Sequence, residues 1–138
     1  MAALTKDKST RFRATAAART NVGDVATATT IYKGALIAKN AAGYVVPASD
    51  TAGLTVIGIA EETVVNAGAN GAKTVKYITN VAAEFVNAGG AIVQASKHGT
   101  CVVADDQSVT TAAVGVNDIV AGKVMEFTAT AVWVFVSE

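Results

Sequence analysis

The stretch Ala131-Val-Trp-Val-Phe-Val136 does most to decide how this chain folds. In an extended strand, successive side chains point to opposite faces, so its three valines share one face while Trp133 and Phe135 share the other. Apolar side chains on both faces indicate that the strand is buried on both sides, or that one face is kept for a partner. The run Gly122–Thr128 just before it is predicted to be another strand.

The composition of the whole chain favours the same fold class. Hydrophobic residues make up 51% of the 138 residues, but most are small: there are 29 Ala and 21 Val against only 3 Leu. A helical bundle is normally rich in Leu, whereas Val together with the 17 Thr of this chain is typical of strands. The length fits one domain, and the apolar content argues against wholesale disorder.

Short apolar runs separated by Gly, Asn and Asp continue through the rest of the chain, and we interpret them as strands. The predicted elements are a hairpin formed by Ile31–Lys39 and Gly43–Val46, a strand Thr55–Val64 with a bulge or bend at Gly58, strands Thr74–Ile78 and Val81–Val86, a helix Ala91–His98 that stops at Gly99, and strands Cys101–Ala104 and Ser108–Thr110 around a turn. Regularly spaced short strands favour a small barrel or sandwich. We therefore predict a mainly β fold, a small β-tulip-like barrel or sandwich with one short helix and an extended N-terminal arm.

Charge separates the N-terminus from the rest. The chain has no net charge, but residues 1–21 carry a net charge of +4 and residues 22–138 a net charge of −4. We predict a basic extended arm over 1–21 and a single β-rich domain over 22–138; a frayed, solvated tail is the alternative. The candidate contact residues of the arm are Lys6, Lys8, Arg11, Phe12, Arg13 and Arg19.

The sequence contains no recognisable catalytic set, so we do not expect an enzyme, a cofactor or a metal. The chain has one His and one Cys, which excludes an intrachain disulfide and a Cys/His zinc site within one chain. We expect His98 to interact with carbonyls at a helix end, and Cys101 to be a small buried side chain.

Other motifs that suggest chemistry fail on spacing or geometry. The segment Gly68–Thr74 lacks the spacing of a phosphate-binding loop and leads into a strand. Neighbours in a strand face opposite sides, so Glu61 and Glu62 are not expected to share a substrate. Asp105 and Asp106 are expected to form hydrogen bonds within a turn.

The charge balance also bears on partners. A chain without net charge offers no overall field for nucleic acid or a membrane surface, so we expect neither partner. No signal peptide or apolar membrane-spanning run is recognisable, which predicts synthesis in a cytoplasm. The arm is better suited to an acidic protein surface or a groove that accepts an added strand.

The order of several segments resembles the head decoration (capsid cement) proteins of tailed bacteriophages, related in fold to the lambda-type decoration protein. The similar stretches are Ile31-Tyr-Lys-Gly-Ala-Leu-Ile-Ala, Gly43-Tyr-Val-Val-Pro-Ala, Leu54-Thr-Val-Ile-Gly-Ile-Ala-Glu-Glu-Thr-Val-Val-Asn, Val102-Val-Ala-Asp-Asp-Gln-Ser-Val, Ala121-Gly-Lys-Val-Met-Glu-Phe and Ala131-Val-Trp-Val-Phe-Val. They run from about residue 30 to the C-terminus and leave the arm outside the match.

The resemblance implies a structural virion protein that binds the outer surface of the expanded capsid and stabilises it. Its partners would be the major capsid protein and further copies of itself. In the family these copies commonly form a trimer at local three-fold sites, although dimeric arrangements are also possible. A second hypothesis comes from the residues alone. Tyr32, Tyr44, Tyr77 and Trp133 could serve a carbohydrate- or peptide-binding module of a fibre or secreted protein.

Overall fold

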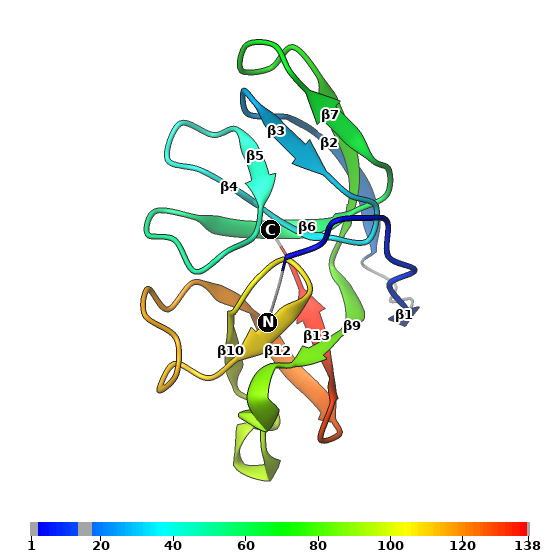
Figure 1. Ribbon diagram of the computed structural model, residues 1–138. Coiled ribbons are helices and arrows are strands. Elements are labelled where there is room, and N and C mark those ends of the chain that lie inside the picture. The colour runs from blue at the N-terminus through cyan, green and yellow to red at the C-terminus, as the bar shows by residue number, and fades with distance from the viewer. Residues whose placement is uncertain (1–2, 14–17, 138) are drawn as a thin grey trace.

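The computed structural model describes residues 3–13 and 18–137 and confirms a mainly β fold. One half of the molecule is a closed barrel, in the lower part of Figure 1. Its strands pair in the order β9–β11–β10–β12–β13, and β13 pairs back with β9 to close the ring. The bounds of these strands are Val81–Asn87 for β9, Thr100–Val103 for β10, Ser108–Thr110 for β11, Val120–Phe127 for β12 and Ala131–Val136 for β13.

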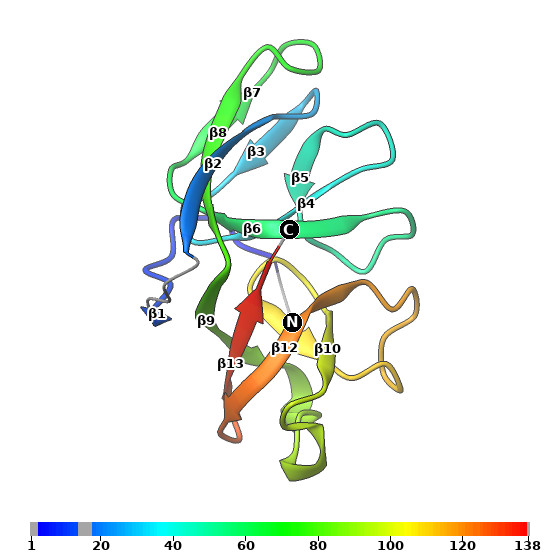
Figure 2. The ribbon, with the colours of Figure 1, turned by 180° about the vertical axis from the view of Figure 1, so that it is seen from behind.

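The other half is a curled sheet with strand order β2–β8–β6–β4–β5, accompanied by the small pair β3–β7. Its strands are β2 (Arg19–Asp24), β4 (Leu36–Lys39), β5 (Val45–Pro47), β6 (Thr55–Ala60) and β8 (Thr74–Thr79), and the pair consists of β3 (Thr29–Ile31) and β7 (Val64–Asn66). In Figure 2, β8 runs directly down into β9. Only Asn80, with a φ of 58°, separates the two strands, so one continuous ribbon joins the halves.

Two apolar clusters fill the molecule. One packs the barrel interior, including Phe85 and the three inward valines of β13, against Leu36 and Ile59 of the curled sheet. The other lies on the opposite face of that sheet and contains Ile37 and Tyr77. Strands β4 and β6 are therefore covered on both faces, and each large side chain buried this way contributes about 1.5–3 kcal/mol.

Most predicted strands are confirmed, but two are split. In the predicted strand Ile31–Lys39, Ile31 ends β3 and only Leu36–Lys39 forms β4, because the chain turns at Lys33 and Gly34. The hairpin around Asn40–Gly43 forms, and β6 carries the predicted irregularity at Gly58, where the register against β4 shifts. A Cβ atom at Gly58 would overlap the carbonyl oxygen of Ile78, which explains the glycine. The predicted strand Thr55–Val64 ends at Ala60, because the chain bends at Glu61 and Glu62 before β7 begins.

The predicted helix Ala91–His98 is wrong. The chain forms only two three-residue 3-10 turns, Ala88–Gly90 and Gln94–Ser96. The backbone is extended at Val93, and His98 adopts a φ of 66°, so helical hydrogen bonding cannot continue through either residue. The N–H of His98 instead donates to the carbonyl of Val124 at 2.8 Å.

Two buried asparagines hold loops in place through their side-chain amides. The amide nitrogen of Asn87 donates to the carbonyls of Ile92 and Thr128, and its oxygen accepts the N–H of Ile92. Asn66 uses its amide group in the same way on the glycine-rich loop, through three carbonyls and the N–H of Gly68. The side chain of Asn66 therefore joins the loop 66–71 to the chain at Val25 and Ala26.

We predict that Asn87→Ala destabilises the protein by about 2–3 kcal/mol, because the buried Ile92 N–H and the two carbonyls lose their partner. Urea unfolding measures the change, with the exposed Gln94→Ala as the control. A loss equal to that of the control would contradict the structural role of Asn87.

Candidate functional site on the N-terminal arm

The described part of the arm, residues 3–13, packs onto both halves of the molecule. Near its start, the N–H of Leu4 donates to the carboxylate of Asp106 in the β10–β11 turn at 2.9 Å. The Leu4 side chain packs against the cluster on the far face of the curled sheet. Further along, the hydroxyl of Thr10 donates to the carbonyl of Gly34 at 2.6 Å. The arm therefore bridges the barrel and the curled sheet.

The end of this segment adds a short strand to the barrel. Strand β1 (Phe12–Arg13) pairs antiparallel with β9, opposite Ala83 and Ala82. The N–H of Glu84 donates to the carbonyl of Arg11 at 3.0 Å. Because β13 occupies the other edge of β9, this central strand has partners on both edges.

Two arginines of the arm cover Trp133 on the outer face of β13. The guanidinium carbon of Arg13 lies 4.2 Å from the centroid of the Trp133 ring, and that of Arg11 lies 5.9 Å from it. Arg11 is also 3.7 Å from the carboxylate of Glu84. At exposed positions such cation–π contacts are worth about 0.5–1 kcal/mol each. The outer apolar face of β13, which the sequence suggested could be kept for a partner, is thus partly covered by the chain's own arm.

Lys8 lies deeper than the other basic residues of the arm. Its N–H donates to the carbonyl of Lys33 at 2.8 Å, and its ammonium nitrogen is 5.8 Å from the centroid of the Phe85 ring. Burial lowers the pKa of Lys8, while the nearby carboxylates of Glu84, Asp105 and Asp106 act in the opposite direction. Lys8 therefore contributes to docking the arm.

The remaining candidates lie apart from this cluster. Lys6 is exposed in a bend, and Arg19 begins β2, opposite Thr79 at the end of β8. The predicted boundary between arm and domain at residue 21 falls inside β2. Residues 1–2 and 14–17 of the predicted arm lie outside the described residues.

Sequence reasoning missed the residues that receive the arm. Gly34 has a φ of 88°, and a Cβ atom there would overlap the carbonyl oxygen of Lys8. Lys33 and Lys76 line a groove beside the arm together with Lys8 and Phe12. The only signal in the sequence was the turn-like Lys33-Gly34 pair within an apolar run, and nothing local linked it to residues 8–12.

The paired carboxylates behave differently from one another. Asp105 accepts the N–H of Gln107 and the hydroxyl of Ser108, which confirms its predicted role in the turn. Asp106 is 2% exposed, and burial raises the pKa of its carboxyl. Glu61 and Glu62 line the same groove, so the prediction that they face opposite sides is wrong: they lie in a bend instead of a strand.

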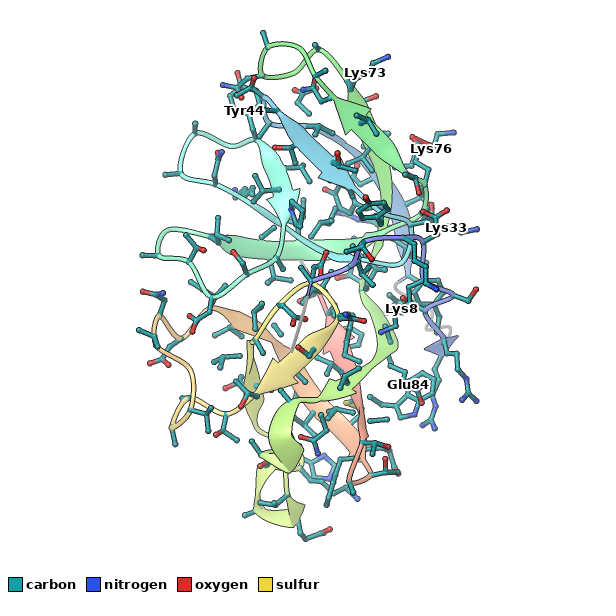
Figure 3. All side chains as sticks on the ribbon, in the orientation of Figure 1. Lys8, Lys33, Tyr44, Lys73, Lys76 and Glu84 are labelled. Carbon is teal, nitrogen blue, oxygen red and sulfur yellow. The ribbon has the colours of Figure 1, made fainter. Side chains whose placement is uncertain are left out.

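The other singled-out residues do not gather into one site. Cys101 is fully buried, as predicted, and burial raises the pKa of its thiol to about 12. His98 is exposed in a turn and does not end a helix. Tyr77 is buried in the core, while Tyr44 lies in the half of the molecule away from β13 and its Trp133 (Figures 1 and 3).

In comparisons with known proteins, the chain matches no protein-family model, no curated protein and no solved structure. Within residues 3–13 and 18–137, no group of three or more His, Cys, Asp or Glu side chains could hold a metal ion. The same residues contain no helix that is long and apolar enough to span a membrane.

We predict that Gly34→Ala displaces the arm, because the added methyl group would occupy the space of the Lys8 carbonyl. Trp133, the single tryptophan, should then become more accessible to acrylamide quenching. Gly43→Ala is the matched control: Gly43 has a φ of 91°, but nothing lies within 4 Å of a Cβ atom there. Equal quenching in both variants would contradict the docking of the arm over Trp133.

We predict that Asp106→Asn raises stability at pH 7. Burial raises the pKa of Asp106 in the folded state, so its ionised form costs folding free energy at neutral pH, and this cost disappears as the pH falls to about 4 and below. Asparagine keeps an oxygen for the Leu4 N–H. Urea unfolding midpoints between pH 4 and pH 7 test this, with the exposed Asp24→Asn as the control. Lower stability of Asp106→Asn at pH 7 would show that the charge is net stabilising.

Proposed function

We propose that this chain is a structural protein of a tailed-bacteriophage virion that binds the outside of the expanded capsid and stabilises it. It acts by adhesion and not by catalysis. Its partners are the major capsid protein and further copies of itself, in a symmetric oligomer for which a trimer at local three-fold sites is the first expectation. The protein would be assembled onto heads in the bacterial cytoplasm and remain on the capsid exterior.

The observation that carries this proposal is the docked arm. Arg11, Phe12 and Arg13 are held in position by β9, Trp133 and Glu84, yet all three remain exposed. A fixed strip with exposed cations and an aromatic ring suits a protein surface, because little conformational entropy is lost when it binds. The resemblance of the segments from about residue 30 onward to decoration proteins supports the same function.

The packing of the domain also supports adhesion to a repeated lattice. The barrel is closed, and β4 and β6 are covered on both faces. A capsid presents the same site many times, so modest contacts suffice when copies are linked. Linking binding events raises the apparent affinity by on the order of 10²–10⁴ without new contacts.

The alternative of a carbohydrate- or peptide-binding module has no comparable support. Two of its four aromatic candidates are not accessible, because Tyr77 is buried and Trp133 is covered by Arg13. A sugar platform needs an accessible aromatic face, and neither of these rings offers one in the docked state.

We expect the wild-type protein to co-sediment with expanded heads assembled from the major capsid protein of the same genome, and to raise the temperature at which those heads break open. Arg11→Gln/Arg13→Gln should bind about tenfold more weakly, because two charged contacts are lost. Lys39→Gln/Lys123→Gln, which removes two exposed cations elsewhere, is the control.

Failure of the wild-type protein to bind either expanded or unexpanded heads would refute the proposed function. Binding that is equally strong in both double variants would leave adhesion standing but remove the arm as its contact surface. Unfolding temperatures of both variants must match that of the wild type, so that a folding defect is not mistaken for weak binding.

A further inference from the structure

A groove of about 610 Å³ lies between the arm and the curled sheet. The residues that matter for its chemistry are Lys8 and Phe12 from the arm, Lys33 from the β3–β4 turn, Glu61 and Glu62 from the bend after β6, and Lys76 from β8. Four separate segments thus meet at one open depression, which we call the arm groove. Figure 3 shows Lys76, Lys33 and Lys8 in succession along one edge of the molecule, with Lys73 beyond Lys76.

Two of the three lysines of the arm groove, Lys33 and Lys76, are available to a partner. Lys33 and Lys76 are exposed, and no carboxylate of the described residues lies within salt-bridge distance of either ammonium group. The backbone holds both in place: the N–H of Lys33 donates to the hydroxyl of Thr63, and the carbonyl of Lys76 accepts the N–H of Glu61. Two cations therefore project from fixed points on different strands and turns.

The two glutamates set the pattern of charge in the groove. Glu61 directly neighbours Lys76 through that backbone hydrogen bond, so positive and negative groups are interspersed. A nucleic acid carries closely spaced phosphates along its whole length, and some of them would face Glu61 and Glu62. A protein segment with carboxylates set apart by other residues can reach the lysines and avoid the glutamates.

Phe12 adds an apolar contact to this pattern. Its side chain is 41% exposed and lines the groove, as Lys8 does. Small-molecule sites are usually enclosed and mostly apolar, whereas this groove is open and lined by charged side chains around one aromatic ring. In protein–protein interfaces, charged side chains typically surround an aromatic side chain that anchors the contact, and the lysines, glutamates and Phe12 of the groove fit this pattern.

We infer that the arm groove binds a short acidic segment of a partner protein, with spaced carboxylates on Lys33 and Lys76 and an apolar side chain on Phe12. This inference rests on the proposed function, in which the partner is the major capsid protein and the segment lies on the capsid exterior. It extends the contact surface beyond the arm, because Lys33 and Lys76 belong to the folded domain.

The test measures binding of purified variants to expanded heads at low and at physiological salt. Lys33→Glu/Lys76→Glu should bind at least about tenfold more weakly than wild type, since two attractive contacts become repulsive, and the loss should shrink as salt rises. Lys39→Glu/Lys123→Glu makes the same change of charge at two exposed sites outside the groove and should bind like wild type. Lys33→Gln/Lys76→Gln, a milder change, should show an intermediate loss and guards against misfolding.

A second experiment titrates the wild-type protein with single-stranded dT20. Equal binding of the groove and control variants to heads would overturn the inference while leaving the proposed function intact. Tight dT20 binding that disappears in Lys33→Glu/Lys76→Glu would also overturn it, because the groove would then serve nucleic acid. Heads that fail to bind even the wild type would refute the proposed function itself.

Discussion

Strand β9 is paired along both of its edges, and this pairing holds the barrel, the core and the docked arm together. On one edge, six residue pairs from Val81–Val136 to Val86–Ala131 join β9 to β13 and close the barrel. On the other edge, β9 pairs with both β1 and β11. Its inward side chains, Phe85 above all, fill the core, and its outward Glu84 contacts the arm. The same strand therefore stabilises the domain and positions the surface proposed to bind.

Strands with a clear local pattern could be predicted from the sequence. The alternation in residues 131–136 and 74–78 records which side chains face the core, and the structure buries those side chains as expected. The predicted hairpin and the bulge at Gly58 also follow from short-range rules for turns and glycine. These features need only neighbours in the chain, which is why the sequence was sufficient for them.

Features set by distant residues could not be predicted. The segment 91–98 has helix-compatible residues, but its end pairs with β12: the N–H of His98 donates to the carbonyl of Val124, and the N–H of Val124 donates to the carbonyl of Gly99. The arm looked like a solvated or projecting tail because its docking depends on Gly34, Asp106 and Trp133, which lie 24 to 120 residues away along the chain. Likewise, Lys33 and Lys76 lie far from Lys8 in the sequence, and only the folded sheet brings the three to one groove.

We propose that this chain adheres to a capsid through the edge that carries the arm. A cryo-electron microscopy reconstruction of expanded heads saturated with the protein would show which edge meets the shell. We expect ordered, symmetric density on the outer surface, with Lys33, Phe12 and Arg13 facing the shell. The loop 111–118, where Val114 and Val116 are exposed, lies on the opposite edge (Figures 1 and 2). Density that contacts the shell through this loop would refute the proposed orientation, and heads without added density would refute adhesion itself.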